Sequence, residues 1–553
     1  MRSSNLLLAL TWTSLSSAAG FCPFLGPVFP APKSYSSPSF QSDLTKLKSA
    51  IEDAFVSGNT THGPVNANDT YSIQIFAASE ASPILDWHRR GVDVAGNSSI
   101  GGDSIYRIAS TTKLLTVYLL LLEAGDGIFN DVVTKYLPEL AGKGFYDQIT
   151  VGALAGYAAG IVSDAYGVDT LPNGGLRAAF PEAFPELDPD EVSPCVYGQS
   201  GCTREIFLQH IATRRQVYLP NTTPAYSNTE YAALGLILES ASGKSYAEAL
   251  KSLLADPLSL KATTVTTPSD STDGVIVGSL EPSAWNLTLD GAGIGMGAAF
   301  STANDMTAIG KAILSSSLLD SNTTRAWLQP TSHTSSLIGA VGLAWEIFRA
   351  TLGPAENNRV VDLYTKSGNV GGYGANLVLV PDFGVGFVIL SASRRGRVPF
   401  ELSGVIVDHL LPALEEAARV EADEKYAGTY IATNGLNSSV TLSTTAGEPG
   451  LSIDSWFSNG TDIRYDPRIF GAPQHFQVYP TNIKSKDGSE ESWRTSFIAL
   501  QDVGPFSACP SWVVTDRPTY GVYGVDEFVF HLDGSGKVTA LELKALKITL
   551  QRQ

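Results

Sequence analysis

The chain of 553 residues has few of the features that mark membrane or nucleic-acid-binding proteins. No run reaches the ~18–20 apolar residues that a membrane-spanning helix needs, so we expect no membrane span. Lys and Arg number only 37 against 55 Asp and Glu, which gives a formal charge of −18. Because nucleic acids are bound by basic patches, this balance excludes them as main partners.

Metal-ligand and nucleotide-binding patterns are also absent. The seven histidines are scattered without metal-ligand spacing: His62, His88, His210, His333, His409, His475 and His531. The glycines from Gly291 to Gly297 do not follow a strand of a βαβ unit, so they form no dinucleotide fingerprint. We expect no metal and no cofactor.

Several features point to export. Apolar residues make up 43% of the chain, with 52 Gly and 30 Pro, which is typical of a globular protein with many turns. Residues 1–19 are typical of a signal peptide, with Arg2, an apolar segment and small residues at Ser17-Ala18-Ala19-Gly20. Eight N-glycosylation sequons follow, at Asn59, Asn68, Asn97, Asn221, Asn286, Asn322, Asn437 and Asn459. We therefore expect a secreted glycoprotein.

The cysteine count fits an oxidising compartment. Only Cys22, Cys195, Cys202 and Cys509 occur, and four cysteines allow three pairings. We favour Cys195–Cys202, which closes a small loop, and Cys22–Cys509, which joins the two ends of the chain. Such bonds contribute ~2–4 kcal/mol of stability.

The pattern of apolar residues predicts an α+β protein with two domains. A strongly apolar helix is expected over residues 109–122, and a hairpin over residues 377–390. Residues 163–203 are rich in Pro, Gly and acidic residues and are predicted to form a loop insertion. A charged stretch precedes a β-rich region. We place one domain at residues 20–420 and a smaller β-rich domain at residues 421–553.

Three short motifs, each present once, contain the candidate catalytic and substrate-binding residues. They are Ser110-Thr111-Thr112-Lys113, Tyr226-Ser227-Asn228 and Lys366-Ser367-Gly368. Any one alone is a weak signal in a chain of this length, but the three in this order form a strong one. The sequence therefore predicts that these three segments meet at one site.

The spacing of the first motif suits an activated serine. A serine hydroxyl needs a base to take its proton, and residues three apart on a helix lie on one face. Lys113 can therefore serve Ser110, provided that burial and a second cation, Lys366, lower its pKa. The backbone N–H groups of Ser110 and Asn369 are the candidate oxyanion donors. The alternative is that Ser110 only caps a helix and Lys113 is solvated.

The other two motifs supply the predicted partners. Tyr226 is expected to relay a proton, and Asn228 to orient the substrate and Lys113. Lys366 is expected to hold a substrate carboxylate and to favour the Tyr226 anion, while Gly368 is expected to let a substrate approach the backbone closely. The alternatives are a helix N-cap at Asn228 and a simple turn at Lys366-Ser367-Gly368.

The three motifs resemble those of the class C β-lactamase, D-aminopeptidase and carboxylesterase group of penicillin-recognising serine enzymes. The flanking segments 106–113, 135–140, 225–235 and 300–306 add to the likeness, which extends over roughly residues 45–415. The resemblance implies an antiparallel sheet flanked by helices plus an all-helical subdomain. It also implies that the β-rich tail is the accessory C-terminal domain of some fungal members.

Three departures bear on specificity. Tyr157 stands where the family usually carries a His in a His-Thr-Ser-Gly segment, and Asn221 replaces a usual Gly near the second motif. The 163–203 insertion is expected to close over the cleft or reshape it. These departures weaken the expectation of classical β-lactam specificity.

The sequence thus predicts a serine hydrolase that acts through a Ser110 acyl-enzyme on an amide, lactam or ester carbonyl of a small molecule or peptide. An acyltransferase that tailors a small metabolite would use the same acyl-enzyme with an alcohol or amine as acceptor. A binding protein that kept the fold and lost turnover is the third hypothesis. The oligomeric state is not predicted.

Overall fold

A computed structural model gives the structure of the chain. The described residues are 20–95, 99–166, 177, 179–188, 191–268, 273–278, 284–289, 291–353, 359–394, 396–470, 475–499 and 504–553. The expected signal peptide and the sequon at Asn97 lie outside them. The chain divides into two compact units, one of residues 33–350 and 361–413, the other of residues 1–32, 351–360 and 414–553.

The first unit is built on an eight-stranded sheet of order β4-β3-β12-β11-β10-β9-β8-β7. The strands are β3 (Thr70–Ala77), β4 (Leu85–Arg89), β7 (Ser332–His333), β8 (Gly339–Val341), β9 (Glu346–Leu352), β10 (Arg359–Val370), β11 (Tyr373–Val380) and β12 (Val385–Ala392). The expected hairpin is confirmed as β11 and β12, which pair antiparallel with Val380 opposite Val385. All residues of β3, β11 and β12 are buried, as expected for a sheet covered on both faces.

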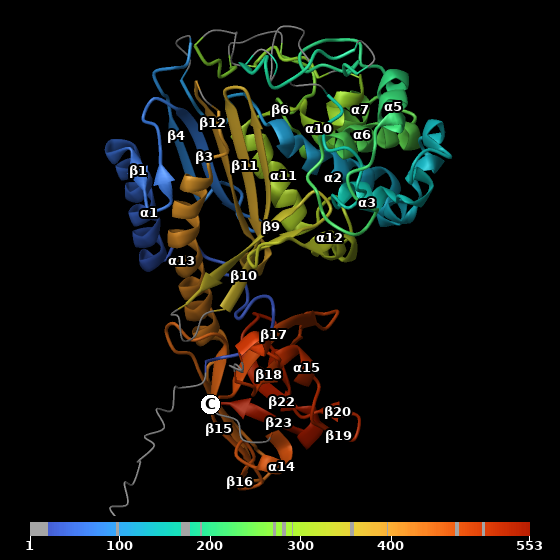
Figure 1. The fold of residues 1–553 in the computed structure, drawn as a ribbon. Helices are drawn as coiled ribbons and strands as arrows, with labels where there is room; N and C mark the ends of the chain where they lie inside the picture. Colours follow the sequence, from blue (N-terminus) through green and yellow to red (C-terminus); the bar gives the residue numbers. More distant parts are fainter. Residues whose placement is uncertain are drawn as a thin grey trace, which may run out of the picture. The chain divides into compact units, whose positions relative to one another are not determined.

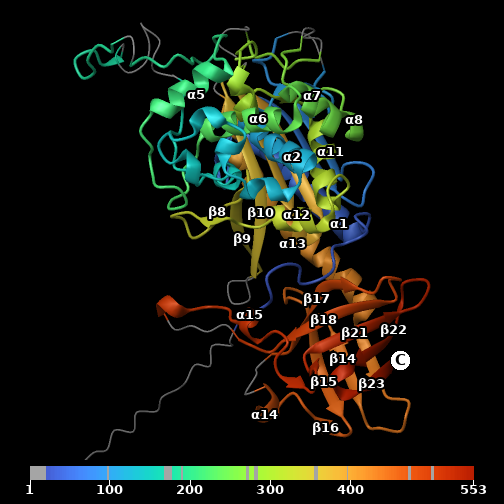
Figure 2. The same cartoon turned by 90° about the vertical axis from the view of Figure 1, so that its right-hand side faces the viewer.

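Helices cover both faces of this sheet (Figures 1 and 2). On one face, Phe55 of α1 (Pro38–Ser57) packs on Tyr71, and Asn376 donates to Ser403 of α13 (Phe400–Tyr426) at 2.9 Å. On the other face, α11 (Ala303–Ser315) lies so close to the strands that a Cβ at Gly310 would meet Phe76 at 2.4 Å. The strand register fixes the two faces because side chains alternate along each strand.

A cluster of helices lies beside the sheet on the α11 side (Figure 1). It comprises α2 (Thr112–Ala124), α3 (Val151–Ala155), α5 (Arg204–Thr213), α6 (Asn228–Ser242), α7 (Tyr246–Leu250), α8 (Asp256–Leu258), α10 (Ile294–Gly297) and α12 (Ser321–Trp327). The ten residues from Thr112 to Leu121 are all buried, which makes α2 the core helix of this cluster. The expected mixed fold, an antiparallel sheet with helices and an all-helical subdomain, is confirmed. Among the described residues no helix is long and apolar enough to cross a membrane.

The second unit contains a closed β-barrel. Its strands are β13 (Gly428–Ile431), β14 (Ser439–Ser443), β15 (Leu451–Ser458), β17 (Gln477–Lys484), β18 (Glu490–Ser496), β21 (Glu527–Leu532), β22 (Val538–Leu543) and β23 (Ile548–Arg552). They run β14-β13-β23-β22-β21-β18-β17-β15, and β15 pairs again with β14 to close the ring. This confirms the expected β-rich C-terminal domain. The predicted boundary at residues 420–421 falls inside α13 and stays a prediction.

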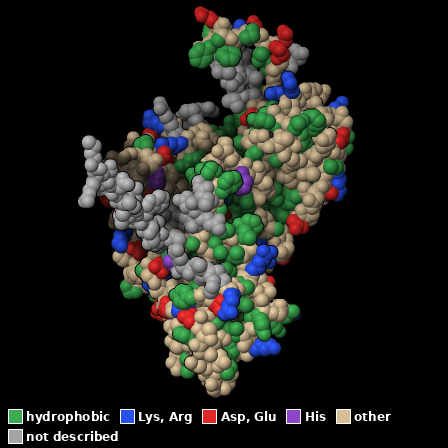
Figure 3. Space-filling model, turned by 60° about the horizontal axis from the view of Figure 1, so that its bottom comes forward, with side chains coloured by type: hydrophobic (Ala, Val, Ile, Leu, Met, Phe, Trp, Pro, Cys, Tyr) green, Lys and Arg blue, Asp and Glu red, His purple; other side chains and the backbone are tan. Residues whose placement is uncertain are grey.

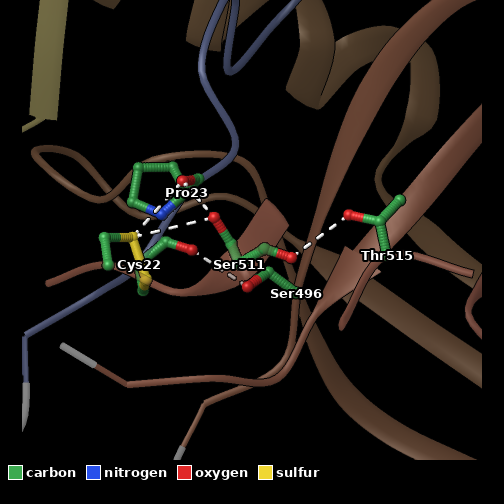
Figure 4. The surroundings of a disulfide bond; sticks show 6 residues. Cys22, Pro23, Ser496, Ser511 and Thr515 are labelled. Atoms are coloured by element: carbon green, nitrogen blue, oxygen red, sulfur yellow. Dashed lines mark hydrogen bonds between the residues drawn. A yellow bond between two sulfur atoms is a disulfide. The ribbon is translucent and has the colours of Figure 1, made fainter. Parts of the chain in front are cut away.

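Both expected disulfides are present, Cys22–Cys509 and Cys195–Cys202. The first ties an N-terminal segment to the barrel unit (Figure 4). Hydrogen bonds reinforce it: Ser496 Oγ donates to the Cys22 carbonyl and Ser511 Oγ to the Pro23 carbonyl, each at 2.9 Å. The N-terminal segment is therefore an integral part of the second unit.

Charged side chains of both signs are interspersed on the face shown in Figure 3, where blue Lys and Arg lie among red Asp and Glu. Exposed ion pairs occur among the described residues, such as Lys135 with Asp131 at 2.8 Å. Exposed pairs of this kind add little stability, because water and salt screen the attraction. The burial of apolar side chains in the two cores is the larger contribution.

Candidate active site

Ser110 lies in a tight turn that leads into the core helix. The helical stretch expected from residue 109 begins as a 3-10 turn, Ala109–Thr111, and becomes α-helical at Thr112. Ala109 has φ +46°, a conformation that residues with a side chain rarely adopt. Thr112 Oγ1 donates to the Ala109 carbonyl at 2.6 Å and fixes this turn. The strained residue, Ala109, thus directly precedes the candidate nucleophile. Backbone strain of this kind is common at functional sites.

Lys113 is fully buried and faces Ser110. Its Nζ donates to Ser110 Oγ at 3.1 Å, to Asn228 Oδ1 at 2.8 Å and to the Met296 carbonyl at 2.6 Å. Burial lowers the pKa of Lys113; the Tyr226 phenol opposes this shift and the charge of Lys366 adds to it. The solvated Lys113 of the alternative hypothesis is excluded. A lysine of lowered pKa can lose its proton and accept another from the serine.

Tyr226 completes this group from the loop before α6. The Nζ atoms of Lys113 and Lys366 lie 5.0 and 5.2 Å from its ring centroid, and both lysines and Ser110 act on the protonation of its hydroxyl. Burial alone would raise the pKa of Tyr226, but the two ammonium groups outweigh it and lower the pKa. The side chain is still 46% exposed, so a substrate can reach it. Ser110, Lys113 and Tyr226 therefore form one group that is open to solvent at Tyr226.

Asn228 contributes its side chain to the site rather than to a helix cap. The N-cap of α6 is Ser227, whose Oγ accepts from the Glu230 N–H at 3.0 Å. Asn228 is the first residue of the helix, and its amide oxygen faces Lys113. The N-cap alternative for Asn228 is therefore wrong, because its neighbour takes that position.

Lys366 has a partner that the sequence did not suggest. Its Nζ, fully buried, donates to Glu346 Oε1 at 2.5 Å, and Ser367 donates to Glu346 Oε2 through both its N–H, at 3.0 Å, and its Oγ, at 2.7 Å. Burial would raise the pKa of Glu346, but Lys366 and Ser367 lower it. Glu346 therefore neutralises, from within the protein, the charge that was expected to hold a substrate carboxylate.

Gly368 brings strand β10 against the nucleophile turn. A Cβ at this position would lie 2.1 Å from the Ile108 carbonyl oxygen and 3.0 Å from the Ser110 nitrogen, which leaves no room for a side chain. Thr111 Oγ1 donates to the Lys366 carbonyl at 3.2 Å and holds the two segments together. Asn369 follows and is exposed, with its side chain bound to the Tyr373 carbonyl. The chain's own turn occupies the space beside the Gly368 backbone, and the approach of a substrate there stays a prediction.

The 163–203 insertion reaches the site through Asp164 and Tyr197. Asn228 Nδ2 donates to Asp164 Oδ2 at 2.9 Å and to the Tyr197 hydroxyl at 3.1 Å. Tyr197 in turn donates to Asp164 Oδ2 at 2.8 Å. The insertion thus contacts a residue of the second motif directly.

Tyr157 lies directly behind Tyr226. The two rings stack with centroids 5.5 Å apart and an interplanar angle of 19°. The Ala225 N–H donates to the Tyr157 carbonyl at 2.8 Å, and Tyr157 itself has φ +61°. This departure from the family pattern therefore supports the ring of Tyr226.

Comparison with family models assigns the chain to a protein family. A family model described as "Beta-lactamase" matches residues 80–408, and one described as "Beta-lactamase-like-like, C-terminal domain" matches residues 418–553. The chain belongs to the β-lactamase family. The resemblance seen in the motifs is thereby confirmed, and with it membership in a group of serine hydrolases.

Some relatives cover both domains of the chain and others cover a smaller part. The Beta-lactamase-like protein of Arthroderma benhamiae is 28% identical over 593 residues, with 98% of each chain covered. The D-alanyl-D-alanine-carboxypeptidase/endopeptidase AmpH of Escherichia coli is 28% identical over 60% of this chain and 84% of AmpH. The octameric penicillin-binding protein homologue of Pyrococcus abyssi has the same fold, with a TM-score of 0.50 and 17% identity over 92% of this chain and 99% of that chain.

Three side chains of this β-lactamase-family site escaped the sequence analysis: Glu346, Asp164 and Tyr197. None belongs to a recognisable motif, and each is set by tertiary contacts. The only signals were indirect, since Asp164 and Tyr197 fall in the insertion that was expected near the cleft.

One group of side chains in the barrel of this β-lactamase-family protein has the composition of a metal site. Among the described residues, Glu490, His531 and Glu542 have ligand atoms within 4.8 Å of one another. His531 Nε2 already bonds Glu542 at 3.1 Å, and His531 Nδ1 lies 3.7 Å from Glu490. His531 is therefore hydrogen-bonded to Glu542, with Glu490 beside it.

Seven of the eight sequons lie among the described residues. Their asparagines, all exposed, are Asn59, Asn68, Asn221, Asn286, Asn322, Asn437 and Asn459. Asn221 lies on the loop beside the site, with its N–H donating to the Ala158 carbonyl. Glycosylation at these positions stays a prediction.

Proposed function

We propose that the protein is a secreted serine hydrolase that cleaves ester or amide carbonyls through an acyl-enzyme on Ser110. The observation that carries this proposal is the buried Lys113 ammonium, 3.1 Å from Ser110 Oγ and in contact with Tyr226. The two disulfides and the exposed sequons support secretion, because both modifications occur in the secretory pathway.

The acylation step follows from these contacts. Lys113 and Tyr226 take the proton of Ser110 as Oγ attacks the carbonyl carbon. The backbone N–H groups of Ser110 and Asn369 bind the developing oxyanion, a role supported by the approach of β10 to Ser110 at Gly368. The proton passes to the leaving group through Tyr226, and water then releases the acyl group.

The charge of the site favours substrates without a carboxylate beside the scissile bond. Lys366, the cation expected to bind one, is fully buried and paired with Glu346. Ser367 also directs both its donors to Glu346. We therefore assign neutral esters and amides, rather than carboxylate-bearing lactams or D-peptides, as the preferred class.

A serine-reactive fluorophosphonate probe tests the nucleophile. Peptide mass mapping of the labelled protein should find the adduct on Ser110, with no label in Ser110→Ala. Label at another serine, or undiminished label in Ser110→Ala, would refute the proposal. Turnover of matched neutral and carboxylate-bearing nitrophenyl esters then measures the charge preference.

Acyl transfer is separated from hydrolysis by product analysis with and without an added amine or alcohol. Free acid as the product in both mixtures supports the hydrolase. A product that carries the acceptor in place of free acid would favour acyl transfer. An acyl adduct that forms and never turns over would favour a binding protein.

A further inference from the structure

Asp164 and Tyr197 form a polar cluster with Asn228 on the side of the amide away from Lys113. Asp164 Oδ2 accepts two hydrogen bonds, from Tyr197 at 2.8 Å and from Asn228 Nδ2 at 2.9 Å. On the other side, Asn228 Oδ1 accepts from Lys113 Nζ at 2.8 Å. A continuous chain of hydrogen bonds therefore runs from the insertion to the base and on to Ser110.

This cluster determines which way the amide of Asn228 faces. An amide has a donor side and an acceptor side, and a rotation of 180° exchanges them. A carboxylate accepts hydrogen bonds and cannot donate them, so Asp164 binds the Nδ2 side. Oδ1 is then left to face Lys113, whose ammonium only donates. Without Asp164, the reversed amide would place a donor against another donor.

The backbone holds Asp164 in this position. The carbonyl of Ser163 accepts from the N–H groups of Asn228, at 2.8 Å, and Thr229, at 3.3 Å. The neighbouring carboxylate thereby lies at the N-terminus of α6, where the helix dipole stabilises negative charge. Tyr197 lies in the loop that Cys195–Cys202 closes, so a covalent bond limits its movement.

We infer that Asp164 and Tyr197 are positioning residues that act through Asn228 to hold Lys113 against Ser110. The inference rests on the proposed acyl-enzyme function and adds to it a role for the insertion. Neither residue contacts Ser110 in the structure. Their effect on acylation therefore requires Asn228 as the intermediary.

A double-mutant cycle tests that requirement. The second-order rate constant for fluorophosphonate labelling is measured for the parent, Asp164→Ala, Asn228→Ala and the double variant. Loss of one hydrogen bond to a charged group corresponds to about a tenfold fall in rate for Asp164→Ala. In the Asn228→Ala background the same change should alter the rate less than twofold. Glu191→Ala, an exposed change within the insertion, is the matched control.

An equal fall in both backgrounds would overturn the inference, because Asp164 would then act without Asn228. Absence of Ser110 labelling in the parent would instead refute the proposed function. If Asp164→Ala does not fold, Asp164→Asn and Tyr197→Phe replace it. Asp164→Asn keeps one acceptor oxygen and should retain most of the labelling rate of the parent. Tyr197→Phe should lower the labelling rate only when Asn228 is present.

The pH profile supplies a readout that a purely structural role would not change. The hydrogen bond from Lys113 to the Asn228 oxygen stabilises the protonated form of Lys113. Weakening this hydrogen bond lowers the pKa of Lys113, so Lys113 becomes a base at lower pH. The low-pH limb of the labelling profile should move to lower pH in Asp164→Ala and in Asn228→Ala. An unmoved limb in folded Asp164→Ala would contradict the positioning role.

Discussion

Glu346 binds the buried Lys366 through a 2.5 Å ion pair inside the candidate site. If this pair cancels the positive charge, Glu346→Gln should restore an attraction for anionic substrates. We expect kcat/KM for a carboxylate-bearing nitrophenyl ester to rise about tenfold relative to a neutral ester of matched size, as one added charge attraction allows. Steady-state kinetics on the two esters measure this ratio.

The matched control for that change is Asp362→Asn. Asp362 pairs with Arg349 at 3.0 Å between the same two strands, so the variant removes the same charge from a neighbouring pair. The ratio of kcat/KM between the carboxylate-bearing and the neutral ester should not change in Asp362→Asn. An equal change in both variants would show that the net charge of the protein, rather than Lys366, sets the preference.

Tyr226→Phe should slow acylation by about 10²–10⁴-fold, the range of a lost general acid–base group. It should also move the low-pH limb of the rate profile to lower pH. The Tyr226 phenol raises the pKa of Lys113, so its removal allows Lys113 to lose its proton at lower pH. Labelling rates measured across pH test both effects, and a limb that moves upward would contradict the coupling of the two groups.

Gly368→Ala should damage both stability and activity. The new Cβ would lie 2.1 Å from the Ile108 carbonyl oxygen, so strand and turn must separate. Overpacking of this kind costs about 1–3 kcal/mol, and displacement of Ser110 should lower the labelling rate further. Gly127→Ala is the control, because a Cβ there meets nothing within 4 Å. Denaturant unfolding measures the stability of both variants, and probe labelling measures their activity. Equal effects in the two variants would mean that the close approach of β10 to the Ser110 turn is unimportant.

Glu230 in α6 gives a prediction for stability against pH. Burial raises the pKa of Glu230 well above its usual value of 4.5, and its Oε2 has no hydrogen-bond partner in the described structure. The folded state thus keeps a proton that the unfolded state loses, and stability falls as pH rises above about 4.5 toward the raised pKa.

Glu230→Gln should remove this dependence because glutamine does not titrate. Its unfolding free energy relative to the parent should increase by about 1.4 kcal/mol per pH unit within that window. Urea unfolding at pH 4.5 and pH 6.5 measures the slope, with the exposed Glu182→Gln as control. A constant difference between parent and variant would mean that Glu230 is ionised in the folded state.

The sequence predicted the contacts of residues that lie close together along the chain or that belong to short motifs. Ser110 and Lys113 are three residues apart on one helical turn, so their contact follows from local geometry alone. Strands β11 and β12 were evident from two apolar runs around a turn. Convergence of the second and third motifs was expected from their joint occurrence and order and from the family resemblance, and not from local geometry.

The missed residues lie where tertiary packing, and not local pattern, decides the contact. Asp164 is 64 residues from Asn228, and Glu346 is 20 residues from Lys366 on a neighbouring strand. Acidic side chains are common in this chain, and nothing local distinguishes these two from the solvated majority. Only the fold shows that they face buried donors.

The barrel of the second unit has a consequence for recognition. Each of its eight strands is bonded to neighbours on both sides, since β14 and β15 join the ends of the sheet. Among the described residues, closure of the ring leaves only short stretches of free strand edge, as where β15 joins β17 at Leu451 and Ser452 alone, so we expect little capacity to accept an extended peptide or to seed a sheet between molecules. We therefore expect the barrel to recognise a partner mainly through its own side chains and connecting loops.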